Sequence, residues 1–244
     1  MSENADYVAI FDVDSRPASD YVVKCVAALE EDGSAVLSQG YRVVNNMNNV
    51  LTKIASFESN FLFDMNQVLS QSYGFLAFMG PTVVRRSFFD GEKFDEEVMD
   101  ETFDLITRMY VTGKTTVLAK TTLGEQAPST LKDIYNQRVR WHRGMVQSFS
   151  RYLVPMAKAP IPFTRKMSWL SIVIFSITDF LFSPVVLFRL DRIAKLSDGP
   201  LEFFMLLFGG IGYSWLKTIC GFVALAQHVT SRKPEWKPSM RSDV

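Results

Sequence analysis

The stretch Tyr7–Pro17, YVAIFDVDSRP, decides the fold that we expect of this chain. Its apolar, β-branched and aromatic residues predict a buried strand that ends in a turn at the acidic residues and the proline. Asp12 and Asp14 lie two residues apart, so both carboxylates can point toward one place. In α/β proteins that place is the carboxyl edge of the sheet, where ligands bind.

The two aspartates have two interpretations. Convergent carboxylates repel each other unless a cation lies between them, and their hard oxygen atoms suit Mg²⁺ or Mn²⁺. Aspartates are also common turn formers at protein surfaces. The motif alone leaves both interpretations open.

Composition sets few limits on the function. The 244 residues include 26 Lys and Arg and 26 Asp and Glu, so nothing global points to nucleic acid, and we expect no nucleic-acid partner. The two cysteines, Cys25 and Cys220, match no metal or disulfide spacing and predict reduced thiols in a cytosol-facing protein. Basic residues gather in 129–166, immediately before the most apolar part of the chain.

Helical and extended patterns alternate in the first half of the chain. Helices are expected at about 20–33, 46–72 and 101–112, because apolar residues recur there at helical spacing between capping and breaking residues. Short strands are expected at 35–38, 73–80 and 115–119. This alternation predicts an α/β sheet domain that ends near residue 125.

Two apolar stretches in the second half, 169–188 and 201–226, are long enough to cross a bilayer. The alternative is a pair of core helices in a soluble domain. Basic residues precede the first stretch and follow the second, which favours a multi-pass membrane protein with both ends and the catalytic part in the cytoplasm. The segment Asp191–Gly199 is then expected outside.

The octapeptide QRVRWHRG at residues 137–144 carries the strongest chemical pattern. On a helix, Gln137, Arg140 and Trp141 share one face. Trp stacks on apolar sugar faces and Arg binds phosphate, so this face suits a sugar with a phosphate-bearing leaving group. An amphipathic helix at a membrane interface would place the same residues at headgroup level.

Several motifs occur in one order along nearly the whole chain: FDVDSRP, FMGPTVVRRSFF, DETFDLITRMYVTGK, APSTLKDIYNQRVRWHRG, two apolar stretches and a terminal KPEWKPSMR. In this the chain resembles the processive family-2 membrane glycosyltransferases, which include cellulose, chitin, hyaluronan and poly-N-acetylglucosamine synthases. The resemblance implies an α/β fold of GT-A type. It divides the chain into a partial transferase domain (1–128), an interfacial helix region (129–167), two transmembrane helices (168–229) and a cytoplasmic tail (230–244).

The resemblance also implies roles for particular residues. Asp12 and Asp14 match the D-x-D element that binds a divalent metal, Mg²⁺ or Mn²⁺, and the diphosphate of the donor. Gln137, Arg140 and Trp141 match the Q-x-x-R-W motif, which holds the nucleotide sugar and the acceptor end. The remaining match, which is less specific, is to an acceptor-side segment and consists of Gln39 and Arg42.

Two departures from the family pattern bear on activity. The motif T-E-D-x-D-L carries the general base on its middle aspartate, where this chain has Thr102, and a hydroxyl does not ionise near neutral pH. Asp100 and Glu101 are the nearest substitutes, at a helix start that favours carboxylates. A family member also places a nucleotide-binding half before the D-x-D strand. We therefore expect the carboxyl-terminal part of a synthase, from a truncated gene model or a split subunit.

Together these features predict a membrane-bound, inverting hexosyltransferase that moves a sugar from a nucleotide sugar, a UDP-sugar in the first instance, to a growing polysaccharide. A non-processive transferase with a glycolipid acceptor carries the same motifs. A catalytically inactive membrane subunit that binds a polymer, working with a separate amino-terminal half or partner, is the alternative outside the enzymes.

Overall fold

The computed structural model describes residues 5–74, 76, 80–90 and 93–230. A mixed five-stranded sheet forms its base, in the order β1-β4-β3-β5-β2. Strands β3 and β5 are parallel, and the other neighbouring pairs are antiparallel. The strands are β1 Tyr7–Ile10, β2 Arg16–Pro17, β3 Ala35–Val44, β4 Thr82–Arg85 and β5 Thr115–Glu125.

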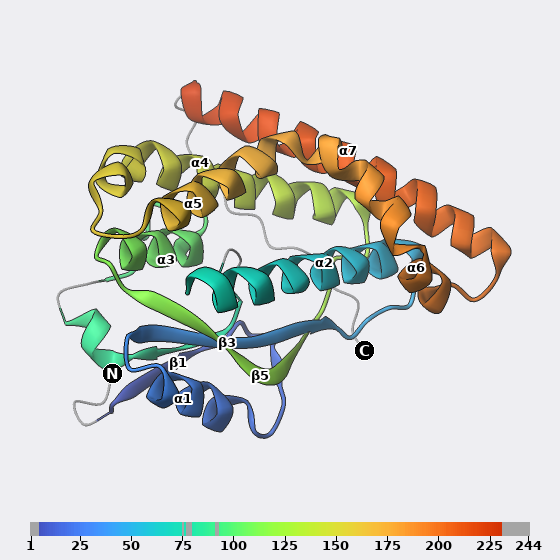
Figure 1. The fold of residues 1–244 in the computed structure, drawn as a ribbon. Helices are drawn as coiled ribbons and strands as arrows, with labels where there is room; N and C mark the ends of the chain where they lie inside the picture. The colour runs from blue at the N-terminus through green and yellow to red at the C-terminus, as the bar shows by residue number, and fades with distance from the viewer. Residues whose placement is uncertain (1–4, 75, 77–79, 91–92, 231–244) are drawn as a thin grey trace.

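Both faces of the sheet are covered by apolar side chains, and β4 shows why. Val83 and Val84 are fully buried in different clusters, because successive side chains of a strand point to opposite faces. Val83 packs with α1 (Tyr21–Glu31), whereas Val84 packs with α3 (Glu101–Val111). Figure 1 shows α1 alone below the sheet and the other helices above it.

The three helices expected in the first half form, and the strands expected at 35–38 and 115–119 form with greater length than predicted. Helix α2 (Val50–Tyr73) begins at a capping box between Asn49 and Thr52 and ends at Gly74, whose φ of 58° lies in the left-handed region. The strand expected at 73–80 does not form in its described half: Tyr73 ends α2, and Gly74, Leu76 and Gly80 lie in no strand, whereas 75 and 77–79 lie outside the described residues. A short 3₁₀ helix, η1 (Arg86–Phe89), follows β4.

The second half is helical and lies over α2 and α3 (Figure 1). Its longest members, α4 and α7, lie against each other. The elements are α4 Leu131–Lys158, α5 Phe163–Thr178, the 3₁₀ segment η2 Asp179–Arg189, α6 Leu190–Leu196 and α7 Pro200–Val229.

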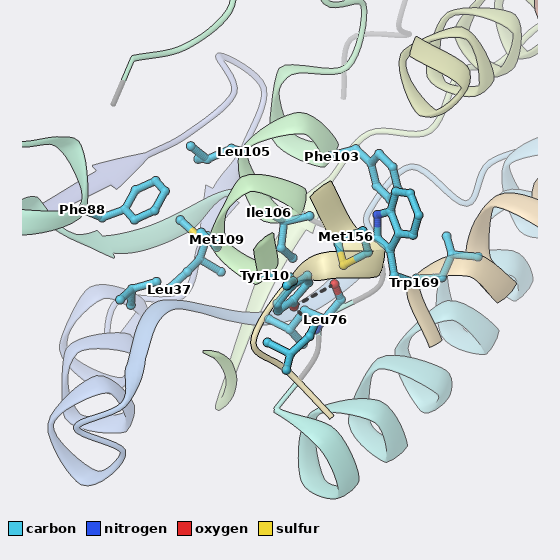
Figure 2. Packing of buried hydrophobic residues seen from close by; sticks show 14 of the residues in the cluster. Leu37, Leu76, Phe88, Phe103, Leu105, Ile106, Met109, Tyr110, Met156 and Trp169 are labelled. Carbon is cyan, nitrogen blue, oxygen red and sulfur yellow. Dashed lines mark hydrogen bonds between the residues drawn. The ribbon is translucent and has the colours of Figure 1, made fainter. Parts of the chain in front are cut away.

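Trp169 joins this helical layer to the core of the sheet domain. Its side chain is 2% exposed and belongs to the cluster that contains Leu37, Val84 and Tyr110 (Figure 2). The indole N–H donates to Thr107 Oγ1 of α3 at 3.1 Å. The first residue of the stretch 169–188 is therefore a core residue of the sheet domain.

The predicted transmembrane hairpin is not seen in this arrangement. Among the described residues one helix, α7, is long and apolar enough to cross a bilayer, while 169–188 is divided between α5 and η2. The segment expected outside also contacts α2, since Lys53 Nζ lies 2.7 Å from Asp198 Oδ2. A hydrocarbon layer about 30 Å thick does not fit between groups in direct contact.

We expect Trp169→Ala to lower the free energy of unfolding by about 3–5 kcal/mol, the usual effect of removing a buried aromatic side chain. Met167→Ala on the same helix is the matched control, because Met167 is 41% exposed. It should change stability by no more than about 0.5 kcal/mol. Denaturant unfolding followed by far-UV circular dichroism measures both. Equal, small effects would mean that α5 does not pack on the sheet domain.

Candidate functional site

The sheet topology brings the ends of three strands to one edge. Strands β1 and β3 are both antiparallel to β4, and β3 is parallel to β5, so β1, β3 and β5 share one direction. Asp12 and Asp14 follow β1 in a turn where Ser15 N donates to Asp12 O at 3.0 Å. Asp12 is exposed and Asp14 partly buried. The D-x-D pair thus lies at the carboxyl edge, beyond the end of β1.

Gln39 and Arg42 lie farther along β3, and both contact the turn before β4. Gln39 is 1% exposed, and its Oε1 accepts from Gly80 N at 3.2 Å. Arg42 pairs with Glu125 at the end of β5. A Cβ on Gly80 would lie 3.1 Å from Arg42 Cδ, so little space remains between these groups. The structure places Gln39 inside the protein as a support for this turn.

Tyr21, which the sequence analysis did not select, contacts β3, the turn before β4 and the end of β1. Its hydroxyl donates to Pro81 O at 2.6 Å and accepts from Gly40 N at 2.9 Å. Its ring lies 5.8 Å from that of Phe11, which precedes the D-x-D pair. Burial raises the pKa of Tyr21, so the hydroxyl stays protonated and can donate. A helix-starting aromatic residue after the aspartates is the only signal in the sequence.

Asp100 caps the start of α3, where the general base is expected. Its Oδ1 accepts from Phe103 N at 3.0 Å and from Thr102 Oγ1 at 2.8 Å. Burial raises the pKa of Asp100, while these hydrogen bonds and the charge of Arg140 oppose that change. Glu101 is exposed. Thr102 therefore orients Asp100, which is the more enclosed of the two candidate carboxylates.

Helix α4 approaches Asp100 very closely and carries the Q-x-x-R-W residues. A Cβ on Gly144 would lie 2.2 Å from Asp100 Cβ and 2.4 Å from its backbone nitrogen, so only glycine fits there. Arg140 precedes Gly144 by one helical turn, which puts both on the side of α4 that faces Asp100. The structure thus brings Asp100 against the side of α4 that carries Gly144 and, one turn earlier, Arg140.

Arg138, inside the same motif, is a further residue that sequence analysis did not select. It is 4% exposed, and its Nη1 donates to Gln137 Oε1 at 2.8 Å. Its guanidinium lies over the Trp141 ring, 4.2 Å from the centroid. Gln137 is itself 6% exposed, while Arg140 and Trp141 are half-buried. Of the three motif residues, the arginine and the tryptophan are the more accessible.

The donor set at the carboxyl edge fits a metal that is only partly held by protein. Among the described residues no group of three or more His, Cys, Asp or Glu side chains gathers at one point. Asp12 and Asp14 supply carboxylate oxygens from one turn. Mg²⁺ is commonly bound by one or two carboxylates together with substrate phosphates and water, and this set agrees with that pattern.

Gly144→Ala should lower the free energy of unfolding by about 1–3 kcal/mol, because the new methyl group overlaps the backbone of Asp100 and forces α3 and α4 apart. Gly212→Ala is the control, since a Cβ on Gly212 of α7 meets no atom within 4 Å. It should raise stability by up to about 1 kcal/mol through helix propensity. Chemical unfolding measures the stability of both variants. A gain in stability in both would contradict the close approach of α4 to Asp100.

The chain is similar in sequence and in fold to known glycosyltransferases. The rice (Oryza sativa subsp. japonica) protein named "Probable glucomannan 4-beta-mannosyltransferase 9" is 28% identical over 159 residues, 63% of this chain and 30% of its own. Glucomannan 4-beta-mannosyltransferase 9 of Arabidopsis thaliana is 27% identical over 154 residues, 61% of this chain and 29% of its own. The matched part therefore spans about three tenths of these relatives.

A solved structure has a similar fold. The mannosyltransferase PcManGT from Pyrobaculum calidifontis, in complex with GDP-Man and Mn²⁺, superposes with a TM-score of 0.59 at 16% identity. The match covers 93% of this chain and 63% of that one, and it supports the GT-A-like fold. The sequence profile described as glycosyl transferase family group 2 matches residues 7–225. The chain belongs to this family of glycosyltransferases.

Proposed function

We propose that the chain carries acceptor-side and metal-binding residues of a membrane-bound, inverting hexosyltransferase that extends a polysaccharide from a nucleotide sugar. The observation that carries this proposal is the contact of α3 with α4, which packs the backbone and Cβ of Asp100 against Gly144, one helical turn from Arg140. The names of its relatives favour mannose, and GDP-mannose is the first donor to test beside UDP-sugars.

Asp12 and Asp14 would hold a Mg²⁺ or Mn²⁺ ion at the carboxyl edge. When bound, the metal supplies positive charge that stabilises the diphosphate leaving group. The packing of Phe11 on Tyr21 holds the start of this turn against β3 and the Gly80–Pro81 turn. The turn is thereby held in place before a ligand binds.

Asp100 is the proposed general base. Phe103 N and Thr102 Oγ1 both donate to Oδ1, so Oδ2 is the oxygen that takes a proton from the acceptor hydroxyl. The hydroxyl oxygen then attacks the anomeric carbon as the bond from that carbon to the diphosphate breaks, which inverts the configuration. Arg140 helps to keep Asp100 ionised and is placed to bind a phosphate.

Replacing Asp12 and Asp14 with alanine should abolish sugar transfer and leave the fold intact, because the two carboxylates lie in a surface turn. Radiolabelled sugar transfer in membranes that contain the chain, with and without EDTA and Mn²⁺, measures the effect. Asp90→Ala, which removes an exposed aspartate, is the control and should stay active. Full activity of the double variant in EDTA would exclude a metal site here.

Asp100→Asn should slow transfer by about 10²- to 10⁴-fold, the usual contribution of a positioned general base, while the exposed Glu101→Gln has little effect. A protonated carboxyl cannot accept a proton, so the rate should fall with decreasing pH. Because burial raises the pKa of Asp100, this fall should begin above the ordinary aspartate value of 3.8 and vanish in Asp100→Asn.

Three results would revise the base assignment. Unchanged rates in both carboxylate variants would contradict it. Because Thr102 stands where the family has its base, a large gain in Thr102→Asp would place the natural position of the base at residue 102. If the parent and all variants bind a polysaccharide but transfer no sugar from any nucleotide sugar tested, the chain is a non-catalytic subunit of a synthase.

We also propose that α7 attaches the protein to a bilayer with its outer face. Polar contacts fix its inner face to α2 and α4 near both ends, from Lys53 to Glu202 and from Arg143 to Gln227. The outer face exposes a continuous set of large apolar side chains, as in helices that lie in the membrane interface. These are Leu201, Phe204, Met205, Phe208, Trp215, Ile219, Phe222, Leu225 and Val229.

Cysteine labelling distinguishes an in-plane helix from the hairpin. Both native cysteines are buried and can be replaced by serine. In intact cells, a membrane-impermeant maleimide should label neither Asp198→Cys nor the control Ser19→Cys on the transferase domain, and should label both after permeabilisation. Labelling of position 198 alone in intact cells would restore the spanning hairpin.

A further inference from the structure

Arg138 is the centre of a buried network that joins three helices. Its Nη2 donates to Glu58 Oε2 of α2 at 2.5 Å, and its Nε donates to Tyr213 Oη of α7 at 2.9 Å. Tyr213 Oη in turn donates to Glu58 Oε2 at 2.8 Å. Lys217 Nζ lies 2.9 Å from Glu58 Oε1 and 2.8 Å from Asp179 Oδ2. Two cations and two anions thus compensate one another inside the protein.

Arg138 also touches two of the Q-x-x-R-W residues, Gln137 and Trp141. One N–H group holds the Gln137 amide oxygen, and the plane of the guanidinium covers the Trp141 ring at 4.2 Å. Since Arg138 is only 4% exposed, a sugar or a phosphate on the surface of α4 cannot reach it. Arg138 can influence a ligand only through its two neighbours.

We propose that Arg138 is a positioning residue that fixes the Gln137 amide and the Trp141 ring for ligand binding, and that Glu58 and Tyr213 fix Arg138 from behind. A planar guanidinium can direct N–H groups to several partners in its plane while its face stacks on an aromatic ring. A lysine has one ammonium group and no plane, so it cannot keep all of these contacts. Helix α7 thereby supports a site on α4, because Tyr213 holds Arg138 in place.

The effect on catalysis rests on the proposed function, whereas the effect on Trp141 does not. Arg138→Lys is the informative variant, because it keeps the charge beside Glu58 and loses the bonded and stacked geometry. Arg143→Lys is the matched control: Arg143 is also buried on α4, 6% exposed, and also bonds to α7, with Nη1 3.1 Å from Gln227 Oε1. Its bond to α7 involves neither Gln137 nor Trp141.

Two measurements test the inference. The emission of Trp141 is obtained as the difference between each protein and the same protein carrying Trp141→Phe. It should change in wavelength or intensity in Arg138→Lys and stay constant in Arg143→Lys. In a transfer assay Arg138→Lys should lower kcat/KM by about 10- to 100-fold, mainly through KM, as expected for a displaced binding group. Arg143→Lys should stay within about twofold at equal thermal stability.

An unchanged Trp141 emission in Arg138→Lys, or equal losses of kcat/KM in both variants, would reduce Arg138 to a structural ion pair and overturn the proposal. If no nucleotide sugar supports transfer by the parent, the proposed function fails. The emission difference still decides whether Arg138 holds Trp141. Tyr213→Phe keeps the ring and removes the shared hydroxyl, and it should shift the Trp141 emission in the same direction as Arg138→Lys.

Discussion

The pairing of Arg138 with Glu58 is the interaction on which the helical layer depends. A guanidinium that is 4% exposed cannot remain charged inside a protein unless anions and acceptors surround it. Glu58 stays ionised because, although burial favours its neutral form, Arg138 and Lys217 together lower its pKa to about 2. Removing either partner would leave an unpaired buried charge, so α2, α4 and α7 are held in one relative position.

The same constraint explains why α7 lies along the transferase domain. Asp179 and Lys217 are the charged residues in the middle of the two apolar stretches, and Lys217 pairs with both Asp179 and Glu58 in the interior. An intramembrane charge is costly and is expected to face protein. Here Lys217 of α7 faces Glu58 of α2, a helix that packs on the sheet. The exposed apolar side chains of α7 lie on the opposite side of that helix, which faces away from the sheet domain.

Local patterns in the sequence predicted the first half of the fold well. The strand before Asp12, the helix ending at Glu31 and the helix starting at Glu101 follow from apolar periodicity and capping residues, which act over a few positions. The sequence underestimated β3, whose polar residues Ser38 and Gln39 read as a strand end. Both are buried and bonded to the turn around Gly80 and Thr82. These hydrogen bonds join segments that are distant in the sequence, so no pattern of neighbouring residues predicts them.

The residues of the candidate site were easier to select from the sequence than their contacts, because those contacts also join distant segments. Motif matching selected Gln137, Arg140 and Trp141, and the structure places all three on α4. It did not select Tyr21 or Arg138, because their importance comes from partners far away in the sequence. It treated Gln39 and Gln137 alike as ligand-binding amides, yet Gln39 is bonded to Gly80 within the fold. The amide oxygen of Gln137 is bonded too, but to Arg138 on the same helix and not to a backbone group.

Two aspartates one turn apart on α3 show how position alone separates a structural group from a reactive one. Asp104 is fully buried, and its Oδ2 lies 2.9 Å from Arg108 Nε, so a permanent cation on its own helix neutralises it. Asp100 lies before the first turn, where free backbone N–H groups hold the carboxylate and burial raises its pKa. The Asp104 carboxylate is therefore engaged by a side chain of its own helix. Asp100 lies against α4, and its Oδ2 takes no part in the two hydrogen bonds that hold Oδ1, which is the arrangement that we propose for a general base.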